Sequence, residues 1–149
     1  MFRILSKNML SAAVCEMEVE AGRVARAALP GQFLIVRVGP EGERVPLTIS
    51  DCDADRGTVT IVTQKVGAST TDIVAMEAGD CFEDVVGPLG LPSEFVKSAP
   101  EGLRDERYVF IAGGVGAAPV YPQVKWLADR GVSVDVIVAA RTADLLIYT

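Results

Sequence analysis

The sequence predicts two successive folding units: an antiparallel β-sandwich or small β-barrel, followed by an incomplete α/β unit. The first prediction rests on short β-rich segments that alternate with turn signals up to residue 98. The second rests on two apolar runs that flank a helical pattern between residues 108 and 149. A polar segment with proline and glycine, residues 98–107, separates them. We therefore expect one unit over 1–98 and another over 108–149.

Five segments of the first unit have strand character: 12–19, 32–38, 45–50, 57–65 and 81–87. In the fourth, Thr58 and Thr60 alternate with Val59 and Ile61, as in a half-buried strand. One helix is predicted over 71–79, with Ser69 or Thr70 as its N-cap and Gly79 at its end. Pro46 removes a ladder donor from the third segment, which predicts an edge strand or an irregular strand end.

The second unit has the pattern of one β-α-β motif. Residues 108–112 form a continuous apolar run, typical of a buried parallel strand, and 132–140 form a second one. A helix is predicted over 117–130, with Pro119 in its first turn and Gly131 at its end. Residues 141–149 resemble the beginning of another helix. Because a two-stranded parallel sheet has open edges, we expect a fragment or a naturally shortened chain. A flavin-free module or fragment of this kind is expected to self-associate.

Composition excludes several kinds of chemistry. The net charge of −6 argues against a nucleic-acid footprint, and the absence of histidine removes histidine-based catalysis and metal sites. Cys15, Cys52 and Cys81 are too widely spaced for a metal knuckle, so redox chemistry would need a bound cofactor. No apolar run approaches the roughly 20 residues of a membrane span, and the N-terminus fits a signal peptide poorly. We expect a cytoplasmic protein.

A glycine-rich turn, Gly113, Gly114 and Gly116, follows the first apolar run of the second unit and opens its helix. Such a turn lets a ligand approach the main chain, and a helix N-terminus attracts phosphate. The third glycine of the dinucleotide fingerprint is replaced by Pro119, and Arg141 stands where an acidic residue is expected. A turn without a ligand is the alternative.

Three further motifs lie in the first unit. Gly67, followed by hydroxyl residues at 69–71, could form an anion cradle or simply cap a helix. In the stretch RVPLTISD, Arg44 could pair with a phosphate and Thr48 could donate to a ring nitrogen, or the segment could be an ordinary edge strand. Residues 86–90, VGPLG, could abut a flat ligand or form only a turn.

The order of these four motifs resembles the ferredoxin–NADP reductase superfamily, and within it the electron-transfer branch. Residues 30–33, 61–67, 86–90 and 139–146 are also similar to that branch, so the resemblance covers nearly the whole chain. It implies a Greek-key antiparallel β-barrel that binds FAD, followed by an incomplete Rossmann-like domain that binds NAD(P)H. It also implies a larger oxidoreductase subunit, or an iron–sulfur protein such as ferredoxin, as partner.

The resemblance also implies roles for individual residues. Those lining the flavin or its phosphates would be Arg44, Val45, Pro46, Leu47, Thr48, Val62, Thr63, Gln64, Gly67, Ser69, Thr70 and Thr71. Those facing NAD(P)H would be Gly113, Gly114, Gly116 and Arg141. No residue is assigned as a catalytic acid, base or nucleophile.

Two departures from the family pattern bear on function. Arg44 lies four residues before Thr48, whereas the superfamily arginine lies three before its hydroxyl residue. The cysteine cluster that holds [2Fe-2S] in this branch is absent from the sequence, as are later strands of the nucleotide domain. We therefore expect an FAD-binding electron-transfer subunit, with a flavin-free docking module or incomplete fragment as the alternative. A stand-alone flavin reductase would need a complete nucleotide domain.

Overall fold

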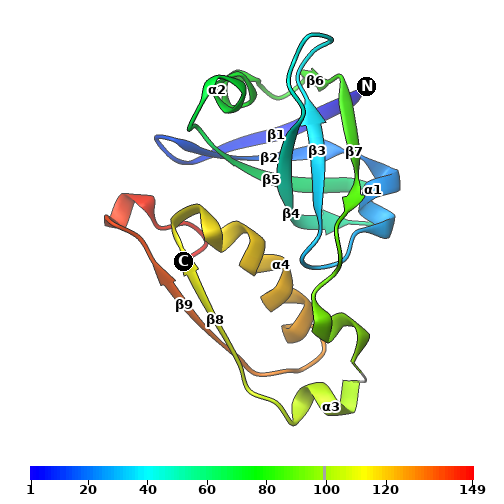
Figure 1. Cartoon of the computed structure of the whole chain (residues 1–149), viewed down its shortest axis with the longest axis vertical. Helices are drawn as coiled ribbons and strands as arrows, with labels where there is room; N and C mark the ends of the chain where they lie inside the picture. The colour runs from blue at the N-terminus through cyan, green and yellow to red at the C-terminus, as the bar shows by residue number, and fades with distance from the viewer. Residues whose placement is uncertain (99) are drawn as a thin grey trace.

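A computed structural model describes residues 1–98 and 100–149 (Figure 1). The strands are β1 (Phe2–Ser11), β2 (Val14–Glu20), β3 (Phe33–Arg37), β4 (Val45–Asp53), β5 (Thr58–Gln64), β6 (Cys81–Phe82), β7 (Asp84–Leu89), β8 (Tyr108–Gly113) and β9 (Val134–Ala139). The α-helices are α1 (Gly22–Ala27), α2 (Ala68–Ala75), α3 (Pro100–Arg104) and α4 (Ala117–Ala128). Short 3-10 turns are η1 (Glu94–Lys97), η2 (Gly114–Gly116) and η3 (Ala143–Leu145).

The first seven strands form one antiparallel sheet in the order β6-β1-β2-β5-β4-β3-β7. The sheet curls into a nearly closed barrel around apolar side chains that alternate along the strands. Its interior includes Ile4, Met17, Leu34, Ile61 and Phe82, each at most 1% exposed. The barrel predicted from the sequence is thereby confirmed.

The second sheet consists of β8 and β9, which pair in parallel from Tyr108↔Val134 to Gly113↔Ala139. Helix α4 connects them and lies between this sheet and the barrel (Figure 1). The predicted β-α-β unit is confirmed, but the predicted burial of its two strands is not. Ile111 is 73% exposed and Ile137 is 54% exposed, because alternate side chains project from the face opposite α4. No described element covers that face.

Pro122 lies inside α4, where it cannot donate a backbone hydrogen bond to the carbonyl of Ala118. That carbonyl instead accepts a hydrogen bond of 3.2 Å from the hydroxyl of Ser50, a fully buried residue of β4. The proline therefore frees a helix acceptor for the barrel. This contact joins the two units at the centre of their interface.

Several expected boundaries differ from the structure. Strand β1 and helix α1 were not predicted, and α3 lies within the segment 98–107 that was expected to be a linker. Leu103 of α3 is buried against Leu127 and Val132, which explains why this segment is ordered against the second unit. Residue 99 lies outside the described residues. The helix expected to begin within 141–149 is only the turn η3, because the backbone of Leu146 is extended and Ile147 is buried in the interface.

Strand β5 is more buried than the predicted half-buried strand, with only Thr60 and Gln64 partly exposed. Thr58 is 3% exposed and donates its hydroxyl to Glu18 at 2.8 Å. Val62, on the outer side of the barrel, packs against Ala117 and Ala118 of α4. The second unit therefore covers the end of a strand whose pattern alone predicted a solvent-exposed face.

Candidate functional site

The barrel wall splits between β4 and β5. Before a register shift at 49–51, residues Val45 to Thr48 pair with β3; after it, β4 pairs with β5. The end of β5, residues 62–64, pairs with β2 and not with β4. Two of the predicted flavin-binding segments, 45–48 and 62–64, therefore lie on the two sides of one opening.

The backbone nitrogen of Pro46, which carries no hydrogen, points toward this opening. The N–H of Ile49 donates to Gln32, next to β3, at 3.3 Å. Because N–H directions alternate along a strand, the nitrogen of Pro46 points to the other edge, where β4 has no ladder partner. The proline thus costs no strand hydrogen bond, although β4 lies between β5 and β3 rather than at a sheet edge. The hydroxyl of Thr48 makes no hydrogen bond within the described residues.

The side chains of residues 62–64 point in different directions. Thr63 is 1% exposed and lies on the interior side of β5 with Ile61, whereas Val62 and Gln64 lie on the outer side. A ligand at the opening could thus reach the backbone of Thr63 but not its hydroxyl. That hydroxyl is the one buried side-chain oxygen or nitrogen, among those described, that lacks a hydrogen-bond partner.

Helix α2 begins directly beyond β5, with Gly67 as its N-cap, three residues earlier than the sequence predicted. Thr70 explains this start, because its hydroxyl accepts hydrogen bonds from the N–H groups of Val66 and Gly67 at 3.0 and 2.9 Å. The hydroxyl of Thr71 donates to the carbonyl of Gly67 at 2.7 Å. The first N–H groups of a helix lack intrahelical acceptors, so the turn retains its capacity to bind an anion.

Two neighbouring residues of the loop before β4 have opposite surroundings. The hydroxyl of Ser69, in the first turn of α2, donates to the carboxylate of Glu43. Arg44 instead lies 3.8 Å from Asp84 of β7, a carboxylate that also pairs with Arg37 at 2.7 Å. The structure thus directs the predicted phosphate ligand Arg44 toward β7, and sequence reasoning did not single out Glu43.

A cleft of about 430 Å³ lies between the two units, beside the glycine-rich turn. Four predicted site residues line it: Gln64, Gly113, Gly114 and Arg141. Its other lining residues are Val14, Val115, Ala139, Ala140 and Leu145. The segments 44–48 and 67–71 do not contribute to this lining, so the predicted residues divide between the barrel opening and the cleft.

Three of the predicted glycines have no conformational or packing reason to be glycine. Gly67, Gly113 and Gly116 have φ values of −158°, −115° and −62°, which any residue can adopt. A Cβ at each would meet no atom within 4 Å. Bare backbone is therefore exposed at both candidate phosphate positions without an internal cause, which fits the close approach of a ligand.

The VGPLG turn differs in this respect. A Cβ on Gly87 would lie 2.9 Å from the Cβ of Leu34, and one on Gly90 would lie 3.0 Å from the ring of Phe33. Gly90 also has a φ of +78°. Both glycines are thus explained by packing and backbone conformation within the barrel, which favours the structural interpretation of this motif.

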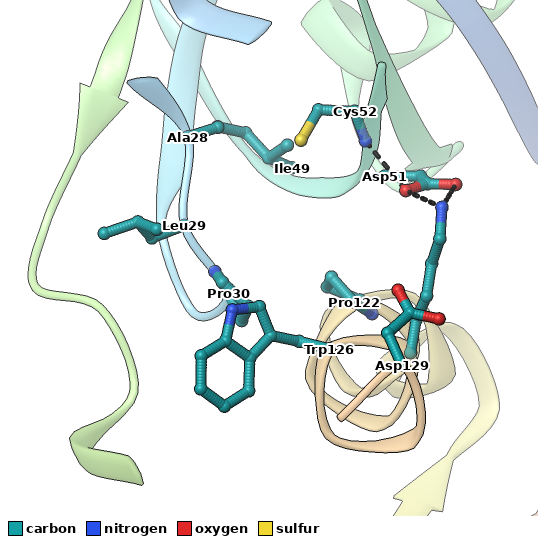
Figure 2. A pocket seen from close by; sticks show the side chains of 10 residues that line it. Ala28, Leu29, Pro30, Ile49, Asp51, Cys52, Pro122, Trp126 and Asp129 are labelled. Atoms are coloured by element: carbon teal, nitrogen blue, oxygen red, sulfur yellow. Dashed lines mark hydrogen bonds and ion pairs between the residues drawn. The ribbon is translucent and has the colours of Figure 1, made fainter. Parts of the chain in front are cut away.

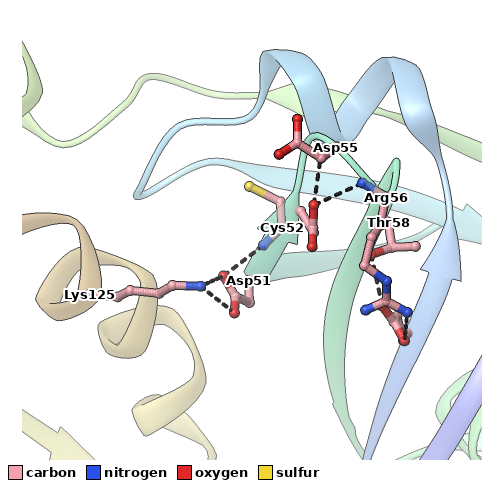
Figure 3. Close-up of polar contacts among 8 residues, drawn as sticks. Asp51, Cys52, Asp55, Arg56, Thr58 and Lys125 are labelled. Carbon is pink, nitrogen blue, oxygen red and sulfur yellow. Dashed lines mark hydrogen bonds and ion pairs between the residues drawn. The ribbon is translucent and has the colours of Figure 1, made fainter. Parts of the chain in front are cut away.

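Polar contacts hold the units together on either side of the Ser50 contact. Lys125 of α4 bridges both carboxylate oxygens of Asp51 (Figure 3), and this hydrogen bond raises the pKa of Lys125. The hydroxyl of Tyr148 lies 3.1 Å from that of Ser50 and also donates to Glu16. Burial, followed by the bond to Glu16, raises the pKa of Tyr148. These contacts fix the glycine-rich turn relative to the barrel, and sequence analysis missed them because each joins distant segments.

A second cavity, of about 260 Å³, lies on the other side of the interface (Figure 2). Its wall is formed by Ile49, Asp51 and Cys52 of β4, by Pro122, Lys125 and Trp126 of α4, and by residues 28–30 and 129. Burial, followed by the charge of Asp51, raises the pKa of Cys52, so its thiol remains protonated at neutral pH. The cavity contains none of the predicted site residues.

The cysteines do not fit an iron–sulfur centre. Cys15 is buried in the barrel, while Cys52 and Cys81 lie in β4 and β6. No three potential metal ligands cluster within the residues that the structure describes. In the same part of the chain, no helix is long and apolar enough to cross a bilayer.

A β-barrel joined to a β-α-β unit, with its glycine-rich turn beside the end of β5, defines a flavin- and nucleotide-binding class of fold. Among solved structures, one reported for NADH-dependent reduced ferredoxin-NADP oxidoreductase matches 100% of this chain and 51% of that chain, with a TM-score of 0.89 and 33% identity. Phthalate dioxygenase reductase, at 18% identity and a TM-score of 0.71 over 99% of this chain and 45% of that one, shows the shared fold. The chain belongs to the ferredoxin–NADP reductase superfamily.

Sequence relatives narrow the placement within the superfamily. A homolog of the dihydroorotate dehydrogenase B (NAD(+)) electron transfer subunit from Thermotoga maritima is 35% identical over 147 residues, covering 97% of this chain and 49% of that protein. The corresponding subunit from Geobacillus kaustophilus is 30% identical over 150 residues, covering 97% of this chain and 56% of that protein. An uncharacterized protein from the adh 3′ region of Clostridium beijerinckii is 53% identical over 148 residues, covering 99% of this chain and 50% of that protein.

The chain is thus a homologue of electron-transfer subunits and spans about half the length of these relatives. No protein-family model matches it.

Proposed function

We propose that this chain is the FAD-binding part of an electron-transfer component that moves electrons between NAD(P)H and a larger oxidoreductase subunit or an iron–sulfur protein such as ferredoxin. The proposal divides the chain into a flavin-binding part, residues 1–98, and a nucleotide-binding part, residues 108–149. The observation that carries it is the bare backbone at Gly67, Gly113 and Gly116, which no internal contact requires.

The proposed flavin site is the opening between β4 and β5. Pro46, Leu47 and Thr48 would line the flavin ring, with the Thr48 hydroxyl as its side-chain donor. The first turn of α2 would hold the phosphates through its N–H groups and the hydroxyl of Ser69. Thr70 and Thr71 would contribute through the backbone, because their hydroxyls already bond to residues 66 and 67.

The proposed nucleotide site is the cleft beside the glycine-rich turn. Gly113, Gly114 and Gly116 would bring a dinucleotide close to the N-terminus of α4, and Arg141 would contact its phosphates or ribose. FAD, when bound, supplies the chemistry of accepting a hydride and releasing electrons singly. The residues of this chain would bind, orient and shield the two ligands.

The experiment is reconstitution of the purified chain with FAD. Binding should give a yellow protein with a perturbed flavin spectrum, and addition of NADH or NADPH under nitrogen should bleach it. A chain that remains colourless after incubation with excess FAD would contradict the proposal. Comparison of the two nucleotides would determine whether NAD or NADP is preferred.

A second candidate function is a flavin-free docking module. It is favoured by the uncovered apolar face of the β8–β9 sheet, which exposes Val109, Ile111 and Ile137. This candidate predicts concentration-dependent self-association, measured by analytical ultracentrifugation, together with no uptake of FAD.

A further inference from the structure

Glu43 reaches the first turn of α2 from a loop that is distant in sequence. The loop connects β3 to β4, and it places the Glu43 carboxylate where it accepts a hydrogen bond from the hydroxyl of Ser69, 26 residues further along the chain. Glu43 itself is exposed and Ser69 is half-buried. A negative charge at a helix N-terminus is favourable, so the contact stabilises this arrangement of the loop.

Ser69 provides the side-chain donor that an anion at this turn would use. The hydroxyl of Thr70 donates to the carbonyl of Gly67 at 3.1 Å while accepting from two N–H groups, and that of Thr71 donates to the same carbonyl. Neither is free to turn toward a ligand without loss of the helix start. The Glu43 carboxylate therefore holds the one hydroxyl of this turn that points away from the helix backbone.

We propose that Glu43 is an internal competitor for the phosphate groups of the ligand at α2, and that it lowers the affinity of the site for phosphorylated flavin. The inference rests on the proposed function and adds a residue that sets ligand affinity. A phosphate oxygen and the carboxylate cannot both accept the single Ser69 proton, and their like charges repel. The adjacent Arg44 does not neutralise the Glu43 carboxylate in this structure, because its ion-pair partner among the described residues is Asp84, at 3.8 Å, and not Glu43.

The substitution Glu43→Gln isolates the charge, because glutamine can still accept a hydrogen bond from Ser69. The dissociation constant of FAD should fall about two- to fivefold, the range expected for one charge near a protein surface. That of riboflavin, which has no phosphate, should not change. Glu41→Gln is the matched control, since Glu41 is exposed in the same loop and has no ion pair within the described residues. The effect of Glu43→Gln should also shrink at high salt.

Two results would overturn the inference. One is an unchanged or raised FAD dissociation constant in Glu43→Gln. The other is an equal gain in riboflavin affinity, because a ligand without phosphate cannot compete with the carboxylate.

A second titration separates this inference from the proposed function. Inorganic pyrophosphate is added to the wild-type protein and to Glu43→Gln, and the amide NMR signals of residues 68–71 report its binding. Tighter pyrophosphate binding by the variant, with no FAD uptake by either protein, would reject the flavin function and retain the competition by Glu43. Equal pyrophosphate titrations of the two proteins would reject the competition.

Discussion

Lys125 Nζ lies 2.7 Å from Oδ1 and 2.8 Å from Oδ2 of Asp51, so a single lysine on α4 bridges both carboxylate oxygens of β4. The N–H of Cys52 donates to the same Oδ1 at 2.8 Å, which orients the carboxylate. Figure 3 shows this contact between the helix and the barrel. Lys125 lies eight residues after the start of α4 at Ala117, and neither residue of the pair lines the cleft beside the glycine-rich turn, so we expect the pair to hold the orientation of α4.

Removal of this ion pair should cost little stability, because both side chains are partly exposed to solvent. We expect Lys125→Met to lower the free energy of unfolding by about 0.5 kcal/mol. A double-mutant cycle with Asp51→Asn, measured by urea unfolding, isolates the interaction energy. A coupling energy within error of zero would show that the contact does not orient α4.

The same pair predicts a loss of stability in alkali. Its hydrogen bond raises the pKa of Lys125 in the folded protein above the unfolded value of about 10.4. A raised pKa means that the stabilisation is complete below the unfolded pKa and is lost as pH rises through the folded one. Melting temperatures of wild type and Lys125→Met should thus differ at pH 8 and converge in alkali, once the pH has risen past the raised pKa of Lys125 in the folded protein. A difference that persists in strong alkali would contradict this assignment.

Adjacent glycines of the turn should respond differently to alanine. Gly114 has a φ of +52°, so Gly114→Ala should cost about 1 kcal/mol of stability from backbone strain. Gly113→Ala should leave the free energy of unfolding nearly unchanged, because its backbone is extended and its Cβ would enter open space. If that space receives a nucleotide, Gly113→Ala should nevertheless weaken NADH binding, measured by titration calorimetry. Unchanged NADH affinity would remove Gly113 from the site.

The sequence predicted the elements whose information is local. Glycine and proline marked the turns, and alternation or apolar runs marked β2, β3, β5, β8 and β9. The contacts that assemble the site are not local. No sequence pattern indicated a role for Ser50. Its hydroxyl bonds to the carbonyl of Ala118, 68 residues further along the chain, and that carbonyl is free only because Pro122 has no N–H. The Glu43 contact was missed for the same reason, because a solvent-exposed acidic loop residue has no pattern that indicates what it will meet.

Motif order predicted more than any single motif did. The glycines at 67, 113 and 116 were ambiguous in the sequence, where each could serve a turn. The structure reduces this ambiguity. It shows that packing requires glycine at Gly87 and Gly90, whereas no neighbouring atom requires it at positions 67, 113 and 116. Distinguishing the two kinds requires backbone angles and neighbouring atoms, and neither can be read from residue identity.

Thr63 should be replaceable by valine with a gain in stability. Its hydroxyl is buried without a hydrogen-bond partner in the described structure, and a polar group in that state costs roughly 1 to 3 kcal/mol. Thr63→Val retains the shape of the side chain, so we expect about 1 kcal/mol of stabilisation in thermal unfolding. Thr63→Ala, which leaves a small cavity, is the control. A destabilised Thr63→Val would show that the hydroxyl has a partner, such as a buried water.

Thr48→Val tests the flavin edge of the barrel. Thr48 pairs with Phe33 in β3, and its hydroxyl makes no hydrogen bond within the described residues, so folding should change little. Loss of a donor to the flavin ring should weaken FAD binding by about three- to tenfold, as expected for one hydrogen bond, or shift the flavin potential. Thr60→Val, on β5 away from the opening, is the matched control. Unchanged FAD affinity and potential in Thr48→Val would remove Thr48 from the flavin site, while equal losses in both variants would indicate a general effect on the barrel.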